Sequence, residues 1–284
     1  MTPPEVLVFP EDEATSSPGW SVRVVPNKYP ALVAEESGKI IANENYKIRT
    51  GLGAHEVIIE SPRHVTEIAN LSEKQFEKIF RAYRTRMSIL RADNRFRYIL
   101  VYKNQGSEAG ATLEHAHSQL IALPMIPKQA LEEITSAKAY YQTNGRCIFC
   151  HLIREETGTR RRVVAENARF IVICPFAPRF PYETWILPKK HLSSFAQSPS
   201  HEDSDLAGIL RDTLIRLERS LGSPPFNYFI HSNPIHETEN DYYHWHLEIL
   251  PKLVRIGGFE WGSGSFINTV TPEESARLLR DSIS

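Results

Sequence analysis

The strongest constraint on how this 284-residue chain can fold is an internal duplication. A histidine shortly after a proline is followed by a long amphipathic segment, an apolar segment and a His-x-His pair, and this order occurs twice. The interval from His64 to His115 and the interval from His191 to His244 differ by only two positions. Self-similarity of this kind predicts two structurally similar halves in one chain.

Hydrophobic spacing indicates which segments of the repeat are helices and which are strands. Apolar side chains recur at helical spacing in residues 76–90 and 206–217, and shorter apolar segments are typical of strands. These strand segments are residues 56–60, 97–103, 170–174 and 184–187. We therefore expect an α+β fold of two similar halves, each a mainly antiparallel sheet with helices, related by a pseudo-twofold axis.

The two halves have expected boundaries. The N-terminal half covers residues 1–126, a connecting helix lies within residues 127–146, and the C-terminal half covers residues 147–284. Short strands are expected at residues 22–25 and 31–34. The glycine-rich, aromatic residues 255–265 are expected to form a loop over a pocket, before a final helix capped by Thr271.

Charge and hydropathy exclude several classes of function. The formal net charge of -1 gives no support for non-specific binding of nucleic acid, which needs a basic face. No apolar segment is long enough to span a membrane, and the first residues do not resemble a signal peptide. We therefore expect a cytoplasmic protein that binds neither nucleic acid nor membranes.

The C-terminal half contains the ligand set of a four-coordinate zinc site. Cys147 and Cys150 form a Cys-x-x-Cys pair, and His191 and His244 supply two more ligands. In the alternative interpretation, two buried thiols and two surface imidazoles never meet. The third cysteine, Cys174, lies inside an apolar segment and is expected in the core.

The N-terminal half contains the matching histidines, His64 and His115, without a cysteine pair. This first metal site is therefore incomplete, and we expect it to bind metal weakly or not at all.

Residues 104–119 are the second place where chemistry is expected. A glycine-bearing loop precedes His115, His117 and Gln119, and an apolar segment follows. If this region is a strand, the three polar side chains share one face, beside a loop whose amides can approach an anion. The alternative is a half-exposed strand with incidental histidines.

These residues resemble the galactose-1-phosphate uridylyltransferase family, the nucleotidyltransferase branch of the histidine-triad superfamily. The resemblance covers residues 20–280 and rests on four segments, which are residues 27–32, 61–64, 104–119 and 244–246. Residues 258–268 look more like the ADP-glucose phosphorylase subgroup of that family.

The resemblance implies that His117 is the nucleophile and that it forms a covalent nucleotidyl-imidazole in a ping-pong reaction. The donor would be a nucleotide sugar, and the acceptor a hexose 1-phosphate or inorganic phosphate. Gln119 would donate to a phosphate oxygen, and His115 ligates a first zinc ion in relatives. The resemblance also implies a homodimer and a set of substrate contacts, which are Asn27, Asn104, Gly110, Thr112 and Glu260.

The second copy of the motif has Glu248 where the first has Gln119. A carboxylate at this position would repel a phosphate, so His246 is not expected to be a second nucleophile. We therefore expect the N-terminal half to carry the reactive histidine and the C-terminal half to bind zinc.

The sequence leaves three alternatives to uridylyl transfer. One is an adenylyltransferase of the ADP-glucose phosphorylase type, and another is a catalytically silent nucleotide-binding module. A zinc hydrolase would need an open metal position, which four protein ligands leave no room for.

Relatives have a Cys-x-x-Cys before a Thr-Pro that resembles Thr2-Pro3, which suggests an N-terminally shortened chain.

Overall fold

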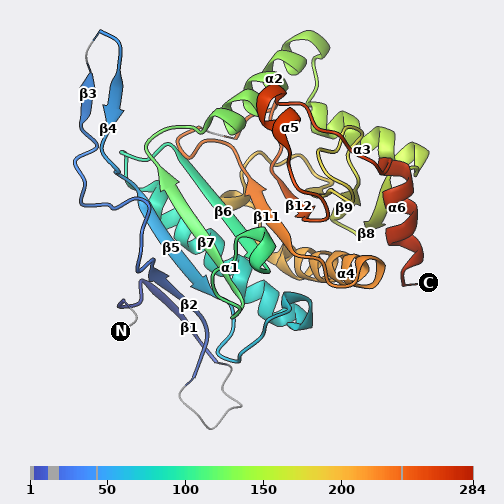
Figure 1. Cartoon of the computed structure of the whole chain (residues 1–284), viewed down its shortest axis with the longest axis horizontal. Helices are drawn as coiled ribbons and strands as arrows, with labels where there is room; N and C mark the ends of the chain where they lie inside the picture. The colour runs from blue at the N-terminus through green and yellow to red at the C-terminus, as the bar shows by residue number, and fades with distance from the viewer. Residues whose placement is uncertain (1–2, 12–18, 43, 238, 284) are drawn as a thin grey trace.

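The computed structural model describes residues 3–11, 19–42, 44–237 and 239–283. The N-terminal shortening suggested by Thr2-Pro3 depends on Thr2 and on a Cys-x-x-Cys segment before it, and both lie outside these residues. Within the described ranges, ten strands form one antiparallel sheet (Figure 1). In spatial order they are β1 (Leu7–Pro10), β2 (Trp20–Pro26), β5 (Ala54–Ile59), β7 (His117–Leu123), β6 (Tyr98–Gln105), β11 (Phe226–His231), β12 (His246–Pro251), β10 (Thr184–Pro188), β9 (Phe170–Ile173) and β8 (Val163–Glu166).

The sheet repeats the duplication seen in the sequence. From the central pair β6–β11 outward, each half supplies five strands in the same order, and β6 and β11 are hydrogen-bonded to each other. Helix α1 (Glu73–Arg91) links β5 to β6, as α4 (Asp203–Leu221) links β10 to β11. The predicted α+β fold with duplicated halves is confirmed, and the two half sheets are joined edge to edge.

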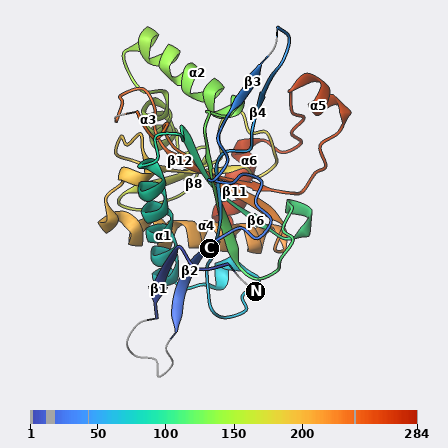
Figure 2. The same ribbon diagram turned by 90° about the vertical axis from the view of Figure 1, so that its left-hand side faces the viewer.

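Helices α1 and α4 pack side by side on one face of the sheet (Figures 1 and 2). The side chain of Ser72 accepts a hydrogen bond from the Gln75 amide and so caps α1. Residues at helical spacing in α1, such as Phe76 and Phe80, are fully buried in the core. Helix α4 is followed by Gly222, whose φ of 73° is a left-handed conformation that glycine adopts readily.

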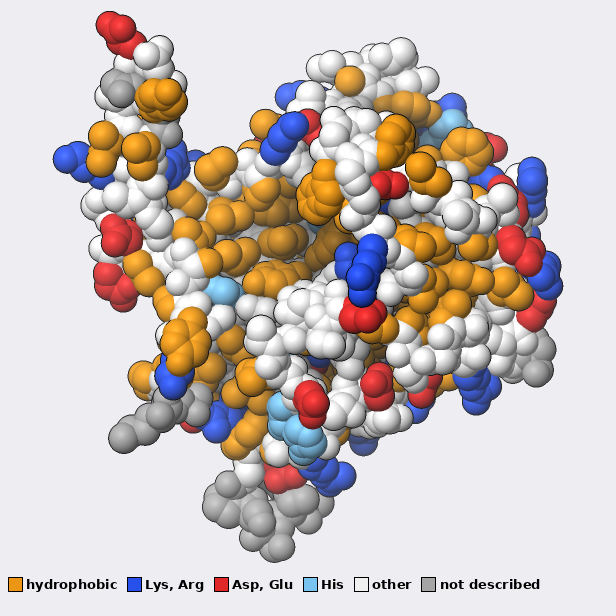
Figure 3. All heavy atoms as spheres, in the orientation of Figure 1, with side chains coloured by type: hydrophobic (Ala, Val, Ile, Leu, Met, Phe, Trp, Pro, Cys, Tyr) orange, Lys and Arg blue, Asp and Glu red, His pale blue; other side chains and the backbone are white. Residues whose placement is uncertain are grey.

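The other face of the sheet is covered over only one half. Helices α2 (Lys128–Asn144) and α3 (Ile148–Thr159) place Ile134, Phe149 and Ile153 in one apolar cluster with Ile171 and Leu187 of the C-terminal strands. No described helix covers the equivalent face of the N-terminal half in this way. There, hydrophobic side chains gather on the open face of the sheet (Figure 3).

Several segments differ from the sequence-based expectation. The strand expected at residues 31–34 is absent from the described structure, where Val33 makes only an isolated bridge to Leu52. The Cys-x-x-Cys segment continues into α3, which was not predicted. The expected loop over residues 255–265 contains a short helix, α5 (Gly258–Ser263), because Glu260 accepts a hydrogen bond from the Gly257 amide at its start.

The remaining elements lie at the periphery. Strands β3 (Ile40–Ala42) and β4 (Lys47–Arg49) form a separate hairpin that projects from the molecule (Figures 1 and 2). Helix α6 (Pro272–Asp281) contacts β8 and α4, and Thr271 caps it as expected. Among the described residues, none of the helices combines the length and the apolar character needed to cross a membrane.

Candidate active site and metal centre

His117 and Gln119 lie on the open face of the N-terminal half. Side chains of β7 alternate between the two faces, so Ser118 and Leu120 point into the core while His117 and Gln119 do not. The prediction that the polar side chains share one face of the strand is therefore confirmed for His117 and Gln119. His115 lies just before β7, and its neighbour Ala116 is held by a backbone hydrogen bond to Glu60.

The open face forms a cavity of about 750 Å³, a size typical of small-molecule sites. Most of its exposed lining is apolar. Five predicted site residues contribute to the lining, which are Asn27, Thr112, His115, His117 and Gln119. Sequence analysis did not identify the apolar lining residues, which include Trp20, Val25, Val57, Ile59 and Leu113.

The ring of His117 is oriented by its own backbone. Its Nδ1 lies 2.8 Å from the carbonyl oxygen of His115, which can only accept, so Nδ1 carries the hydrogen and donates. The lone pair of the neutral ring is then on Nε2. Burial lowers the pKa of His117 from its usual value of 6.5, which favours this neutral form.

A buried ion pair lies beneath His117, on the core side of the sheet. Lys103 Nζ donates to the carbonyl oxygen of His117 at 2.8 Å and to Glu60 Oε2 at 2.6 Å. The hydroxyl of Tyr83 donates to the other oxygen of Glu60. Lys103 and Glu60 are 1% and 0% exposed, so this cation fixes the backbone of His117 from within the core.

The glycine loop is held by the C-terminal half. Gly106 and Gly110 have φ values of 81° and 88°, which L side chains rarely adopt. Asn227 of β11 donates to Asn104 Oδ1 and to the Ala109 carbonyl, both at 2.8 Å. Asn104 and Gly110 were predicted to contact the substrate, but they are not among the described residues that line the cavity. In this structure they contribute to the shape of the loop.

Glu260 lies apart from these residues. It lines a second cavity of about 180 Å³ together with Arg179, Arg255 and Phe266. The structure does not place Glu260 among the residues that line the cavity around His117. Its contact with a sugar stays a prediction.

The four predicted zinc ligands come together. The ligand atoms of Cys147, Cys150, His191 and His244 all lie within 4.8 Å of one another. Cys150 Sγ is 3.3 Å from His191 Nδ1 and 3.6 Å from His244 Nδ1. Tetrahedral zinc would separate sulfur and nitrogen ligands by about 3.6 Å.

The ring tautomers of both histidines also fit a metal ion. His191 Nε2 is 2.8 Å from the carbonyl oxygen of Asn240, and His244 Nε2 is 2.8 Å from that of Pro188. Each Nε2 must therefore donate, which leaves each Nδ1 without a hydrogen and facing the cysteines. A hydrogen bond from Cys150 lowers the pKa of Cys147, so one thiolate is already favoured.

The N-terminal half repeats only the histidine part of this arrangement. The ring centroids of His64 and His115 are 5.5 Å apart, close to the 5.3 Å between His191 and His244. His115 Nε2 donates to the Ser61 carbonyl, as His244 donates to that of Pro188. Among the described residues, no third histidine, cysteine or carboxylate ligand lies beside this pair.

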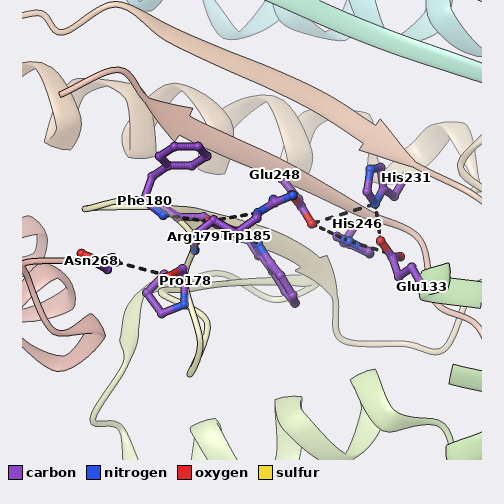
Figure 4. A network of polar contacts seen from close by, with 10 residues as sticks. Glu133, Pro178, Arg179, Phe180, Trp185, His231, His246, Glu248 and Asn268 are labelled. Carbon is purple, nitrogen blue, oxygen red and sulfur yellow. Dashed lines mark hydrogen bonds and ion pairs between the residues drawn. The ribbon is translucent and has the colours of Figure 1, made fainter. Parts of the chain in front are cut away.

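A second cluster lies where the C-terminal half would have its own active site. Ligand atoms of Glu133 from α2, His231 from β11, and His246 and Glu248 from β12 lie within 4.8 Å of one another (Figure 4). His231 Nδ1 contacts Glu133 at 2.6 Å, and His246 Nε2 contacts Glu248 at 3.3 Å. Sequence analysis missed Glu133 and His231, because only the tertiary fold brings α2 over β11 and β12.

His246 is consequently unlike His117 in its surroundings. It is fully buried, and the ring of Phe149 from α3 lies 4.9 Å from its own. Burial opposes protonation, but the carboxylates of Glu133 and Glu248 raise the pKa of His246 overall. Glu248 is also paired with Arg179 (Figure 4). These contacts support the expectation that His246 is not a second nucleophile.

Comparisons with family models agree with the two halves of the structure. Residues 11–127 match the model described as galactose-1-phosphate uridyl transferase, N-terminal domain. Residues 133–264 match the model of the C-terminal domain of the same enzyme.

Individual relatives cover nearly the whole chain. ADP-glucose phosphorylase from Arabidopsis thaliana is 36% identical over 98% of this chain and 78% of its own length. Galactose-1-phosphate uridylyltransferase from Thermotoga maritima is 30% identical over 90% of this chain and 82% of its own length. The crystal structure of the Arabidopsis ADP-glucose phosphorylase with bound ADP-glucose has a TM-score of 0.87, with 35% identity, and covers 98% of this chain and 85% of that chain.

Proposed function

The chain belongs to the galactose-1-phosphate uridyl transferase family and is an enzyme of the nucleotidyltransferase class, and we propose that it transfers a nucleotidyl group through a covalent intermediate on His117. The donor is a nucleotide sugar and the acceptor is a hexose 1-phosphate. The observation that carries this proposal is the orientation of His117, whose Nδ1 donates to the His115 carbonyl inside the cavity that Gln119 also lines.

The chemistry follows from these groups. Nε2 of His117 attacks the α-phosphorus of the donor, the bond from that phosphorus to the bridging oxygen breaks, and the sugar 1-phosphate leaves. The positive charge that the ring acquires is stabilised at Nδ1 by the His115 carbonyl. Gln119 donates to a phosphate oxygen. A phosphate oxygen of the acceptor then attacks the adduct and returns His117 to its neutral form.

A second candidate is phosphorolysis of ADP-glucose, in which the transferred group is AMP and the acceptor is inorganic phosphate. The observation that favours it is the 36% identity to a relative named ADP-glucose phosphorylase over 98% of this chain. Both candidates use the same nucleophile and differ only in base and acceptor.

One experiment tests the proposal and separates the two candidates. The protein is incubated with UDP-glucose or with ADP-glucose, and its intact mass is measured without an acceptor. We expect a UMP adduct or an AMP adduct that disappears when the correct acceptor is added. A protein that binds a donor with no adduct would instead be the silent nucleotide-binding module.

The rate of adduct formation should depend on pH through His117. Neutral imidazole is the nucleophile, and because burial lowers the pKa of His117, the ring stays neutral to a lower pH than an exposed histidine. The midpoint of the decline in single-turnover rate with falling pH should therefore lie below 6.5, the usual pKa of histidine. A midpoint above 6.5, with donor affinity unchanged, would contradict this assignment.

We further infer that Cys147, Cys150, His191 and His244 hold a zinc ion. A metal with four protein ligands has no open position, so zinc would tie the start of α3 to the segments that follow β10 and precede β12, and would take no part in the transfer. In the N-terminal half, His64 and His115 form the incomplete first site, which binds metal weakly or not at all.

Loss of zinc should lower stability before it affects chemistry. Cys150→Ser is expected to lose about one zinc ion per chain by elemental analysis and to unfold at a lower temperature. Cys174→Ala is the matched control. Cys174 is fully buried in the apolar cluster that includes residues of α1 and α4, away from the four ligands, so this variant should keep its zinc ion. An unchanged zinc content in Cys150→Ser would contradict the site.

The homodimer and the cytoplasmic location implied by the sequence stay predictions. Sedimentation of the purified chain would test the first.

A further inference from the structure

His55 has a ring tautomer that the structure determines. It lies on β5, and its Nδ1 is 3.1 Å from the backbone nitrogen of Ala31. A backbone N–H can only donate, so Nδ1 is the acceptor and the ring hydrogen of the neutral form is on Nε2. This Nε2 lies 2.8 Å from the side-chain oxygen of Gln119 and donates to it.

Two further donors converge on the same oxygen of Gln119. The hydroxyl of Tyr102 on β6 lies 3.1 Å from it, and Asn27 Nδ2 lies 3.5 Å from it. Asn27 is itself oriented, because its Oδ1 accepts from the backbone amide of Tyr29 at 2.9 Å. The 3.2 Å between Asn27 Nδ2 and His55 Nε2 then separates two donors that share one acceptor.

The orientation of the Gln119 amide decides what the cavity offers to a phosphate. With its oxygen held by these donors, the amide nitrogen is left to donate, and Gln119 lines the cavity beside His117. The reversed orientation would present a carbonyl oxygen, which repels an anion, and would face His55 and Tyr102 with an amide that cannot accept. Oriented donors at a transferring phosphate stabilise the charge that it carries in the transition state.

The strand register gives an independent comparison within the same chain. Gln119 pairs with Val57 and Tyr102, and Glu248 pairs with Trp185 and Phe229 at the same places in the C-terminal half. The counterpart of Tyr102 is therefore Phe229. His55 lies two residues before Val57 and Glu183 two residues before Trp185, so Glu183 is the counterpart of His55. In the C-terminal half, Glu183 and Phe229 thus replace the two donors, and the residue that corresponds to Gln119 is Glu248, which is paired with Arg179.

We propose that His55 is a positioning residue of the phosphate site and that, with Tyr102, it fixes the Gln119 amide so that its nitrogen donates to the transferred phosphate. This inference rests on the proposed nucleotidyl transfer, since it assigns the phosphate contact of that reaction. His55 itself does not touch the phosphate.

The tautomer of His55 can be measured without any activity. In protein labelled with ¹⁵N-histidine, long-range proton–nitrogen correlations distinguish Nε2–H from Nδ1–H rings. His55→Phe identifies the relevant signals by their loss. We expect the neutral Nε2–H form in the free enzyme. The Nδ1–H form would overturn the proposal, whether or not the enzyme transfers nucleotides.

A double-mutant cycle tests whether His55 acts through Gln119. His55→Phe should slow adduct formation on the order of 10²-fold in single turnovers, while donor affinity changes little. In a Gln119→Ala background, His55→Phe should cause no further loss. An equal loss in both backgrounds would overturn the proposal.

Tyr102→Phe provides a second variant in case His55→Phe does not fold. It removes one hydroxyl, and its effect should likewise be smaller in the Gln119→Ala background than in the wild type. An effect of equal size in the two backgrounds would overturn the role given to Tyr102. Absence of any adduct in the wild-type protein would instead refute the proposed function, and the tautomer measurement would still decide the geometry.

Discussion

Replacement of His117 by alanine is expected to lower nucleotidyl transfer by about 10⁴-fold or more and to abolish the covalent adduct. The corresponding histidine of the C-terminal half, His246, is not among the described residues that line the cavity. His246 is fully buried, and its Nε2 is engaged by Glu248. The measurement is intact mass after incubation with the donor, together with the steady-state rate of exchange.

The variant should still fold and bind the donor. The cavity is lined mostly by other residues, so donor affinity measured by calorimetry should change far less than the rate. His201→Ala is a matched control, because this histidine is exposed two residues before α4, and the variant should transfer at the wild-type rate. Adduct of undiminished amount in His117→Ala would place the nucleophile elsewhere.

Replacement of Lys103 by methionine is expected to lower the free energy of unfolding by about 3–5 kcal/mol. This large effect follows from burial, because Lys103 and Glu60 are 1% and 0% exposed. Methionine fills much of the same space but leaves the Glu60 carboxylate in the core with no cation beside it. Urea denaturation monitored by tryptophan fluorescence would measure the change.

Two controls separate loss of the ion pair from a general effect of the substitution. Lys103→Met combined with Glu60→Gln should recover part of the lost stability, since no unpaired charge remains. Lys128→Met removes a lysine from a pair whose side chains are 89% and 66% exposed and should leave stability unchanged. A Lys103→Met protein as stable as the wild type would contradict the structural role of this pair.

The residues predicted from sequence are those whose roles are encoded locally or by repetition. His117 and Gln119 share a face because the side chains of a strand alternate. The four zinc ligands were predicted together because the histidines are repeated and a Cys-x-x-Cys pair precedes the second set. The order of α1, α4 and the strands next to them also followed from hydrophobic spacing, whereas α3 was not predicted and the strand expected at residues 31–34 is absent from the described structure. None of these inferences required knowledge of which strands are neighbours.

The residues that were missed depend on pairings between distant segments. His55 reaches Gln119 only because β5 pairs with β7, and Asn227 reaches the glycine loop only because β11 pairs with β6. Glu133 lies far from β12 in sequence, and only the packing of α2 brings it to His246. A single sequence contains no signal for such neighbours.

The continuous sheet described above also has a consequence for how the protein unfolds. One apolar cluster extends from Val22 in the N-terminal half to Leu279 in the C-terminal half. Separating the halves would expose β6 and β11 as free edges, whose unpaired backbone groups favour aggregation. We therefore expect the duplicated halves to unfold together in one cooperative transition and not as independent units.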